Sequence, residues 1–325
     1  MLLIGDIGGT HARLSLLNPQ GRRVRQEAFE SRRYPSLEAV VREFLGKPTP
    51  RVSAAAFGIA GPVVNGRCTA TNLPWVIDAR ALSRKLRVRT VTLLNDLVAL
   101  SLGALGVARS KLHVMGGAGA PKKKGANVAV IAAGTGLGEA LLVWDGARFV
   151  ATATEGGHSD VSPRDDLEVE LLHFLRARFG HVSWERVLSG DGLGNLYDFF
   201  RQAKNVAETA ENAQAIVAAV DRNAAISELG MSGKSEAAAR AVDLFASMYG
   251  AEAGNLALKS LAVGGVFVCG NIAARMLPVL DRGGFQRAFV DKGRFTPLME
   301  RVPVAVVLDS DVGLAGAARV ALGHT

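Results

Sequence analysis

The sequence predicts an α/β protein in which the order βββαβαβα occurs twice, as two domains with a cleft between them. The chain has 325 residues, about twice the length of a typical domain. Hydrophobic residues make up 49% and charged residues 21%, which suits a globular protein and excludes disordered and fibrous classes. A turn rich in Gly and Thr joins the first two strands of each copy, so the two halves match at the same point.

The first copy is expected to begin with three strands and to continue with alternating helices and strands. Apolar runs bounded by turn residues predict the strands, and Ser36 and Asp78 are residue types that favour helix starts. The expected strands are 2–6, 12–17, 24–31, 52–59 and 87–94, and the expected helices are 36–45, one that starts at 78, and 96–105.

The same order begins again after a Gly- and Lys-rich loop at 116–125. Strands are expected at 127–133, 137–143, 148–154, 265–269 and 302–308, and helices at 166–178, 272–280 and 312–322. A mostly helical stretch at about 179–262 has no counterpart in the first copy. We therefore expect a small α/β domain of residues 1–108 plus 311–325, and a large α/β domain of residues 109–310 that carries this insertion.

Composition narrows the class of protein. Cys68 and Cys269 lie far apart in apolar stretches, which argues against disulfides and a thiolate zinc site and fits a reducing cytoplasm. No uncharged apolar run is long enough for a membrane helix, and residues 2–6 form a strand pattern rather than an export signal.

The net charge of +8 leaves open nucleic acid, an anionic substrate or a merely soluble surface. The dense basic run at 121–125 contains no aromatic residue, so we expect a solvated loop and no nucleic-acid partner. The other histidines are scattered without metal-ligand spacing, and we assign no metal to His11, His113, His173, His181 or His324.

The two matched turns are candidate phosphate sites. Glycines let backbone N–H groups converge on an anion, and a threonine hydroxyl adds a donor, although the glycines could serve only to allow positive φ in a tight turn. No P-loop is present, and the second turn leads into a strand, which argues against a Rossmann site. The candidate residues are Gly8, Gly9 and Thr10 in the first turn and Gly134, Thr135 and Gly136 in the second.

Two carboxylate-bearing segments of the first copy are candidates for the remaining chemistry. Asp6 could hold a phosphate-bound Mg²⁺ through water, or could cap the first turn. Asn95 and Asp96 end an apolar strand where α/β sheets bind ligands. Asp96 is a candidate general base for phosphoryl transfer, with a helix N-cap as the alternative.

A polar cluster follows the third strand of the second copy. Glu155 and His158 flank two glycines and could bind a polyhydroxylated ligand, or could form only a polar turn. Glu185 is less decisive, because a solvent-facing residue or an ion pair with Arg186 would explain it equally well.

Taken together, these motifs resemble the bacterial ATP-dependent glucokinase family. The matching segments run in the family's order over nearly the whole chain. The resemblance is to the branch distinct from the ROK sugar kinases, whose zinc-binding cysteine cluster is absent here. The matching segments are GDIGGTHARL, NLPWVID, LLNDLVALSLG, AAGTGLGEALL, EGGHSD, GHVSWERVLSGDGLGNLY, GGVFVCGNIAARML and AFVDKGRF.

This resemblance implies the duplicated actin-like ATPase (ribonuclease H-like) fold and a cytoplasmic enzyme that phosphorylates glucose at its 6-hydroxyl with ATP and Mg²⁺. It also implies a homodimer and a place at the entry to glycolysis. By motif, Asp96 resembles the catalytic base, Asn95, Glu155, His158 and Glu185 resemble the sugar contacts, and Gly270 with Asn271 lies where the nucleoside is expected. The two turns are similar to the family's phosphate-binding positions.

Two positions depart from the family's pattern, and other functions remain open. His11 stands where related enzymes often have Asn, and Gly270-Asn271 replaces a common Gly-Gly pair, where a side chain could narrow the base pocket. A kinase for mannose or glucosamine would use the same site. A non-catalytic sugar sensor would be expected to lose the base or a turn, and a chaperone-type ATPase would need a peptide-binding domain.

Overall fold

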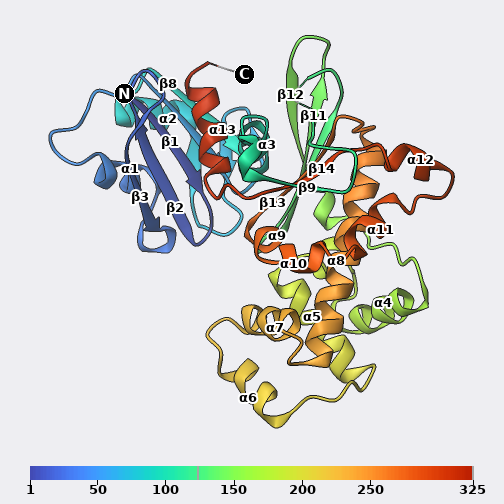
Figure 1. Ribbon diagram of the computed structural model, residues 1–325. Coiled ribbons are helices and arrows are strands. Elements are labelled where there is room, and N and C mark those ends of the chain that lie inside the picture. Colours follow the sequence, from blue (N-terminus) through green and yellow to red (C-terminus); the bar gives the residue numbers. More distant parts are fainter. Residues whose placement is uncertain (123, 324–325) are drawn as a thin grey trace. The chain divides into compact units, whose positions relative to one another are not determined.

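The structure is a computed structural model that describes residues 1–122 and 124–323 (Figure 1). The chain divides into two compact units, which are described separately. The first unit comprises 1–108, 142–153 and the stretch that begins at Asp309, and the second comprises 109–141 and 154–308. Lys123 of the expected basic loop, His324 and Thr325 lie outside the described residues.

The first unit contains a sheet with the strand order β3-β2-β1-β4-β8. The first three strands pair antiparallel, and β1, β4 and β8 pair parallel. This confirms the meander and the two later strands of the first copy. The strands are β1 (Leu2–Ile7), β2 (His11–Leu17), β3 (Arg23–Glu30), β4 (Ala54–Ile59) and β8 (Thr90–Asn95).

Helices cover both faces of this sheet because alternate residues of β1 point to opposite sides. Leu3 and Ile7 belong to a core with α1 (Leu37–Leu45) and α2 (Ala79–Leu86). Leu2 and Ile4 belong to a separate core with α13 (Val312–Ala321). The predicted caps are confirmed: the Ser36 hydroxyl accepts from Ala39 N at 3.3 Å, and Asp78 Oδ1 accepts from Ala81 N at 2.7 Å.

A small antiparallel sheet in the first unit was not predicted. It has the order β5-β6-β7, with β5 (Val63–Val64), β6 (Arg67–Thr69) and β7 (Val76–Asp78). These strands have two or three residues each, too few to produce a recognisable alternation of polar and apolar residues.

The second sheet repeats the order of the first. Its strands run in the order β12-β11-β10-β13-β14. An edge strand that was not predicted, β9, pairs antiparallel with β14. The shared order supports the expected duplication, and the α/β fold class is confirmed. The strands are β9 (Leu112–Met115), β10 (Val128–Ala133), β11 (Leu137–Trp144), β12 (Phe149–Thr154), β13 (Gly265–Cys269) and β14 (Val304–Val307).

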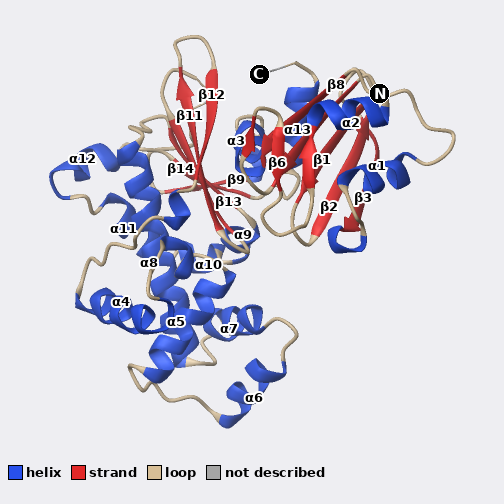
Figure 2. Ribbon diagram, turned by 180° about the vertical axis from the view of Figure 1, so that it is seen from behind, coloured by secondary structure: helices blue, strands red, loops and turns tan. Residues whose placement is uncertain are grey.

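The helical stretch expected from the sequence is built around α8 (Glu236–Lys259), which packs against α5, α7 and α11 (Figure 2). One helix prediction was wrong in detail. The helix expected at 272–280 is two helices, α9 (Asn271–Arg275) and α10 (Leu277–Leu280), because Pro278 has no N–H to continue the first. The other helices are α4 (Asp166–Phe179), α5 (Gly190–Gln202), α6 (Ala210–Ala218), α7 (Arg222–Met231), α11 (Gly284–Val290) and α12 (Thr296–Met299).

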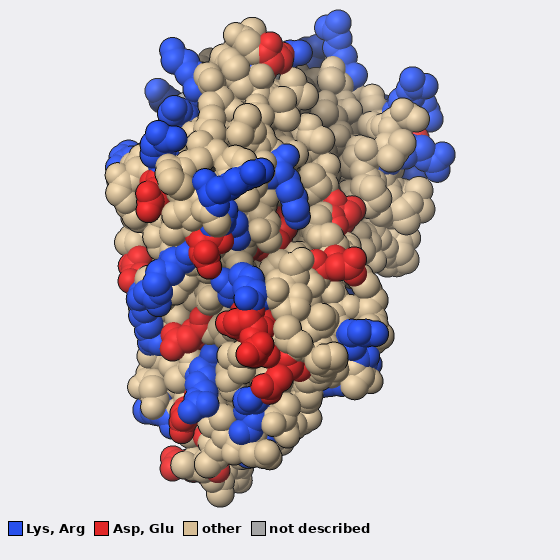
Figure 3. Space-filling model, turned by 90° about the vertical axis from the view of Figure 1, so that its right-hand side faces the viewer, with Lys and Arg blue, Asp and Glu red and all other residues tan. Residues whose placement is uncertain are grey.

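The surface shows mixed charge. In the central and lower part of the face in Figure 3, basic and acidic side chains lie among one another. In the predicted basic loop, Lys122 and Lys124 are exposed and belong to no helix or strand. Among the described residues, no helix combines the length and apolar character that crossing a membrane requires.

The helices α3 (Asp96–Ala104) and α13 lie side by side (Figure 1) and touch through their backbones. A Cβ at Gly316 would overlap the carbonyl oxygen of Ala99, and a Cβ at Gly103 would overlap that of Val312. Glycine is therefore required on both sides of this contact, because a larger residue would push the helices apart.

We expect Gly316→Ala to lower the free energy of unfolding by at least about 2 kcal/mol, because its methyl group has no space beside Ala99. Urea denaturation followed by circular dichroism would measure this. Ala315→Ser, on the exposed side of the same helix, is the control and should change stability by less than about 0.5 kcal/mol. Equal effects of the two substitutions would contradict the close-contact explanation.

Candidate functional site

The predicted residues of the first unit meet at one edge of its sheet. Across the parallel ladder, Ile7 pairs with Ile59 and Ile59 with Asn95, so β1, β4 and β8 end in one row. The turn Gly8–Thr10 follows β1, and Asp96 follows β8. The carboxyl edge of a parallel sheet is where α/β proteins bind ligands.

Asn95, rather than Asp96, is the N-cap of α3. Its Oδ1 accepts from Leu97 N at 2.9 Å and Val98 N at 3.2 Å, and its Nδ2 donates to Gly61 O at 3.1 Å. Asp96 is the first residue of the helix, and its half-buried carboxylate accepts from Leu97 N at 3.0 Å. The N-cap alternative for Asp96 is therefore wrong, and Asn95 has a structural role beside any contact with a ligand.

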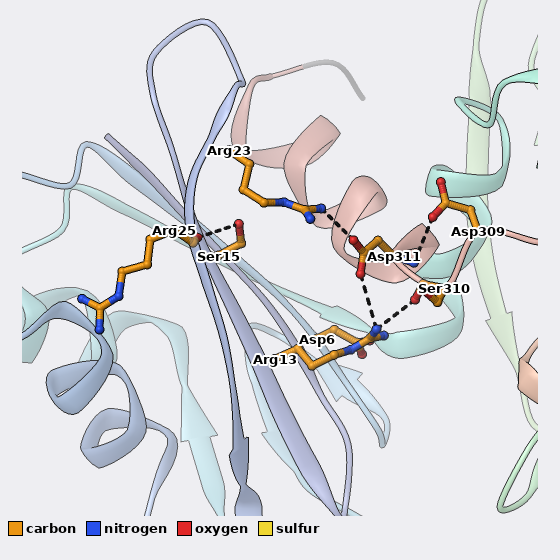
Figure 4. A network of polar contacts seen from close by, with 8 residues as sticks. All are labelled: Asp6, Arg13, Ser15, Arg23, Arg25, Asp309, Ser310 and Asp311. Carbon is orange, nitrogen blue, oxygen red and sulfur yellow. Dashed lines mark hydrogen bonds and ion pairs between the residues drawn. The ribbon is translucent and has the colours of Figure 1, made fainter.

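Asp6 belongs to a network of charges in the first unit (Figure 4). Arg13, on the neighbouring strand β2, forms an ion pair with Asp6 and donates to Ser310 O at 2.9 Å. Asp311 Oδ1 lies 3.6 Å from Arg13 Nη1, and Asp311 Oδ2 lies 2.8 Å from Arg23 Nη2. The Asp6 side chain is 25% exposed and contacts Arg13 through Oδ2. Its other oxygen is the one that could accept from a metal-bound water.

The predicted residues of the second unit also follow strand ends. Ala132 pairs with Cys269, so the turn Gly134–Gly136 and Gly270 come after adjacent parallel strands. Tyr249 of α8 fixes the first of these strands, since its hydroxyl accepts from Ala133 N at 3.1 Å.

Glu185 lies on this turn. Its Oε2 accepts from Leu137 N at 3.0 Å, and Gly190 N donates to Gly134 O at 2.9 Å. The ion pair with Arg186 considered from the sequence is replaced by another contact, because the Arg186 guanidinium lies over the Phe179 ring at 4.3 Å.

The glycines of the two turns do not serve to allow positive φ. Gly8, Gly9, Gly134 and Gly136 all lack it. A Cβ at Gly9 would lie 2.6 Å from Asn72 Cβ, and one at Gly136 would overlap the Glu185 carboxylate, whereas Gly134 faces open space. Close approach, and not backbone conformation, therefore explains Gly9 and Gly136.

The open space beside Gly134 is a cavity of about 700 Å³. This volume is in the range of small-molecule sites. Three predicted residues, Gly134, Thr135 and Asn271, line it. The rest of the lining comes mainly from α5, α7 and α9 and escaped sequence reasoning, since no local motif marks it: Gly190, Asp191, Leu193, Asp221, Asn223, Ala224, Ser227, Glu228, Met231, Ile272, Arg275 and Met276.

Gly270 precedes the cavity residue Asn271 and has a firm structural requirement. Its φ is +91°, and a Cβ there would lie 2.5 Å from Ala133 O. Glycine is the residue that tolerates both conditions. The exposed Asn271 side chain, by contrast, adds an amide to the wall of the cavity.

Glu155 and His158 are exposed at the end of β12, on a turn that rests on β11. A Cβ at Gly157 would overlap Leu137 O, and one at Gly156 would overlap the Glu139 carboxylate. The turn therefore presents its two polar side chains to solvent while its glycines pack against the neighbouring strand.

Glu139 is a further residue that the sequence reasoning missed, although a lone carboxylate in the apolar run 137–143 was a visible signal. It is 2% exposed. Burial, and next the nearby Glu252 carboxyl, raise the pKa of Glu139 to about 7. Burial likewise raises the pKa of Glu252, which lies on α8 and is fully buried.

No group of three or more His, Cys, Asp or Glu side chains that could hold a metal ion occurs within residues 1–122 and 124–323. His113 pairs with Asp281 and His181 with Asp160, each at 2.9 Å. A metal ion at this site would therefore have to take most of its ligands from a substrate and from water.

Comparison with known proteins identifies the family. The family model described as Glucokinase matches residues 3–324. A curated protein from Nostoc punctiforme named Glucokinase is 38% identical, and the match covers 98% of each chain.

Solved structures agree with this. A glucokinase from an Antarctic psychrotroph has a TM-score of 0.83 at 29% identity, covering 100% of this chain and 99% of its own. A ROK family glucokinase from Streptomyces griseus, solved in complex with glucose and AMPPNP, has a TM-score of 0.66 at 22% identity, covering 98% of each chain.

The raised pKa of Glu139 predicts a pH-dependent loss of stability. Between its usual value of 4.5 and about 7, the folded protein keeps a proton that the unfolded chain has released, so stability falls as pH rises through this window. Glu139→Gln removes this term. The difference in the free energy of unfolding, variant minus wild type, should therefore rise by roughly 2–3 kcal/mol between pH 5 and pH 8.

Urea midpoints and slopes at several pH values, measured on both proteins, check this. Ionisable groups that do not interact with Glu139 cancel in the difference, which therefore reports on Glu139 together with Glu252. A difference that stays constant from pH 5 to pH 8 would show that Glu139 has an ordinary pKa.

Proposed function

Because the chain belongs to the glucokinase family, we propose that it transfers the γ-phosphoryl group of ATP to the 6-hydroxyl of D-glucose. The observation that carries this proposal is the pair of Gly-Thr turns at the carboxyl edges of two equivalent sheets. One turn opens on a cavity, and the other lies at the same sheet edge as a carboxylate at the start of a helix. Such an arrangement suits phosphoryl transfer, in which positioning and charge stabilisation supply most of the catalysis.

The nucleotide is proposed to occupy the cavity beside Gly134. A ligand's phosphates could approach the backbone there, because no side chain stands within 4 Å of where a Cβ would be. Thr135 adds a hydroxyl, and Asn271 offers an amide to the nucleoside. The solved relative that contains AMPPNP supports this choice of ligand.

Magnesium is proposed as an ion carried by the nucleotide. The protein donor proposed for it is one carboxylate, Asp6, whose Oδ2 is engaged by Arg13, so phosphates and water would supply the other ligands. Asp6 Oδ1 is the atom proposed to hold a metal-bound water. When bound, Mg²⁺ neutralises charge on the phosphates.

Asp96 is proposed as the general base. Its carboxylate lies at the carboxyl edge of the first sheet, and Asn95 fixes the helix start on which it stands. It would accept the proton of the 6-hydroxyl as the oxygen attacks phosphorus. General base catalysis of this kind typically contributes a factor of about 10² to 10⁴.

The sugar is proposed to bind through Glu155, His158, Asn95 and Glu185. The first two are exposed on their turn and available to hydroxyl groups. Glu185 uses Oε2 to hold Leu137 N, so Oε1 is the oxygen proposed for a sugar hydroxyl. A sugar contact at Glu185 would then act on the same residue that fixes the phosphate turn.

Several finer expectations from the resemblance remain part of the proposal. The chain's two cysteines are too few for the cysteine cluster of the ROK enzymes, which supports the other branch. Both are buried and unpaired in disulfides, which suits a cytoplasmic location. With it we propose a homodimer and a place at the entry to glycolysis. The same proposal includes the domain limits expected from the sequence and closure of those domains on the substrates.

The proposed activity predicts glucose-dependent consumption of ATP. Purified protein with MgATP should release ADP rapidly only when a hexose is added, because an enzyme that hydrolysed ATP with water would waste it. A coupled assay with glucose, mannose and glucosamine, compared by kcat/KM, should rank glucose first. A higher value for another hexose would reassign the substrate, and no stimulation by any hexose would favour a sensor or an ATPase.

Asp96→Ala should lower kcat by at least about 10² with glucose binding changed much less, because the base acts in the transition state. Steady-state kinetics together with glucose titration of intrinsic fluorescence would separate the two effects. Asp78→Ala is the matched control, because it removes the N-cap of a different helix, α2. It should lower the free energy of unfolding by about 1 kcal/mol without lowering kcat. Near-normal turnover in the Asp96 variant would contradict the assignment.

A further inference from the structure

The geometry points to Glu139 as a positioning residue that, as an uncharged carboxylic acid, holds the turn of Glu155 and His158 in its glucose-binding form. This inference rests on the proposed function, because it assigns a supporting residue to the proposed sugar site. Glu139 itself lies below the turn and is not offered as a substrate contact.

The first support is the way the turn sits on β11. Thr154 Oγ1 donates to the backbone carbonyl of Glu139 at 3.2 Å, and Gly156 N donates to Thr154 Oγ1 at 3.1 Å. A Cβ at Gly156 would overlap Glu139 Oε2, so the carboxyl group touches the turn where only glycine fits. Any displacement of this carboxyl group toward the turn must therefore move the backbone between Glu155 and His158.

The second support is a polar atom that has lost water without gaining a partner. Glu139 is 2% exposed, and its Oε1 has no hydrogen-bond partner among the described residues. A buried carboxylate with an unsatisfied oxygen would carry a large desolvation cost, which protonation removes. The geometry thus favours the neutral acid.

A neighbouring carboxyl group also favours the neutral acid. Burial is the largest cause that raises the pKa of Glu139 to about 7, and the fully buried Glu252, on α8, is the next. Asn255 and Lys259 already engage the Glu252 carboxylate, at 2.8 and 3.3 Å, and Lys292 acts on it from the segment after α11.

Two other groups complete these surroundings. Burial raises the pKa of the Tyr249 hydroxyl, also on α8, and the nearby Glu139 carboxyl raises it further. Lys259 lowers the pKa of Glu139, but by less than Glu252 raises it. An ionised Glu139 would therefore place a second negative charge beside Glu252 in a region with little water.

Ionisation then has a consequence for the sugar site. Repulsion between the two carboxylates displaces that of Glu139, which already touches the turn at Gly156, where no space exists. The turn yields, and Glu155 and His158 lose their positions. Glucose binding is expected to weaken as pH rises through neutrality, whereas ATP binding, which uses the separate turn 134–136, is expected to change little.

The experiment compares the wild type with Glu139→Gln, which keeps the size and the neutral, hydrogen-bonding character of the acid. KM for glucose and for ATP would be measured from pH 6 to pH 8. In the wild type the glucose KM should rise about 3-fold or more relative to the Gln variant, with the ratio of ATP KM values unchanged. His158 is present in both proteins, so the ratio isolates Glu139.

Two more variants distinguish this role from simple packing. Glu139→Leu fills the space without a polar group and should raise the glucose KM at every pH. Glu252→Gln removes the repelling carboxylate and should move the midpoint of the wild-type rise to lower pH. The Leu variant fails as evidence if it does not fold, but the Gln and Glu252 variants still decide the question.

Parallel pH profiles for wild type and Glu139→Gln, or an unshifted midpoint in Glu252→Gln, would overturn this role while leaving the proposed function intact. A folded wild type that phosphorylates no glucose would overturn the proposed function, and this positioning role with it. The two failures are therefore distinct.

Discussion

The parallel pairing of β1, β4 and β8 holds Ile7, Ile59 and Asn95 in one row, and the polar groups of the first unit depend on this row. A parallel ladder brings the carboxyl ends of its strands to the same edge, where the candidate turn and the helix start both lie. The second sheet repeats the arrangement through Ala132 and Cys269. Residues that are far apart in the sequence, Gly8 and Asn95, are thus brought to one edge by apolar strands that contribute no chemistry themselves.

Local patterns were sufficient to predict the elements that bear this edge, because strands such as 2–7 and 128–133 are short, apolar and bounded by glycine. The caps Ser36 and Asp78 were equally visible, since capping is a contact between near neighbours in the chain. The cavity lining was not predictable, because Asp191, Asn223 and Arg275 come from three separate helices, α5, α7 and α9, that only tertiary packing assembles. The break between α9 and α10 could have been found, since Pro278 stands in the middle of the expected helix.

Several motif residues have structural duties that limit how they can act on a ligand. Asn95 caps α3, Glu185 fixes the turn at Leu137, and Asp6 faces Arg13 (Figure 4). Each of these polar side chains uses some of its atoms to hold the backbone in place, which leaves a single oriented oxygen or N–H group for a substrate. Such preorganisation lowers the entropy lost on binding, and it also means that substituting these residues changes the fold locally as well as the contact.

The contact between α3 and α13 joins the first and the last of the chain segments that make up the first unit. The apolar residues Leu2, Ile4 and Ala56 are covered by Leu314 and Ala317, which are synthesised about 260 to 315 residues later, after the whole second unit. During translation one face of the first sheet therefore stays exposed until α13 leaves the ribosome, while the second unit, continuous apart from the hairpin tip at 142–153, can form its core earlier. The order of synthesis thus makes the first unit the last to be completed, and a chaperone that shields a bare sheet face would act on the N-terminal part of the nascent chain.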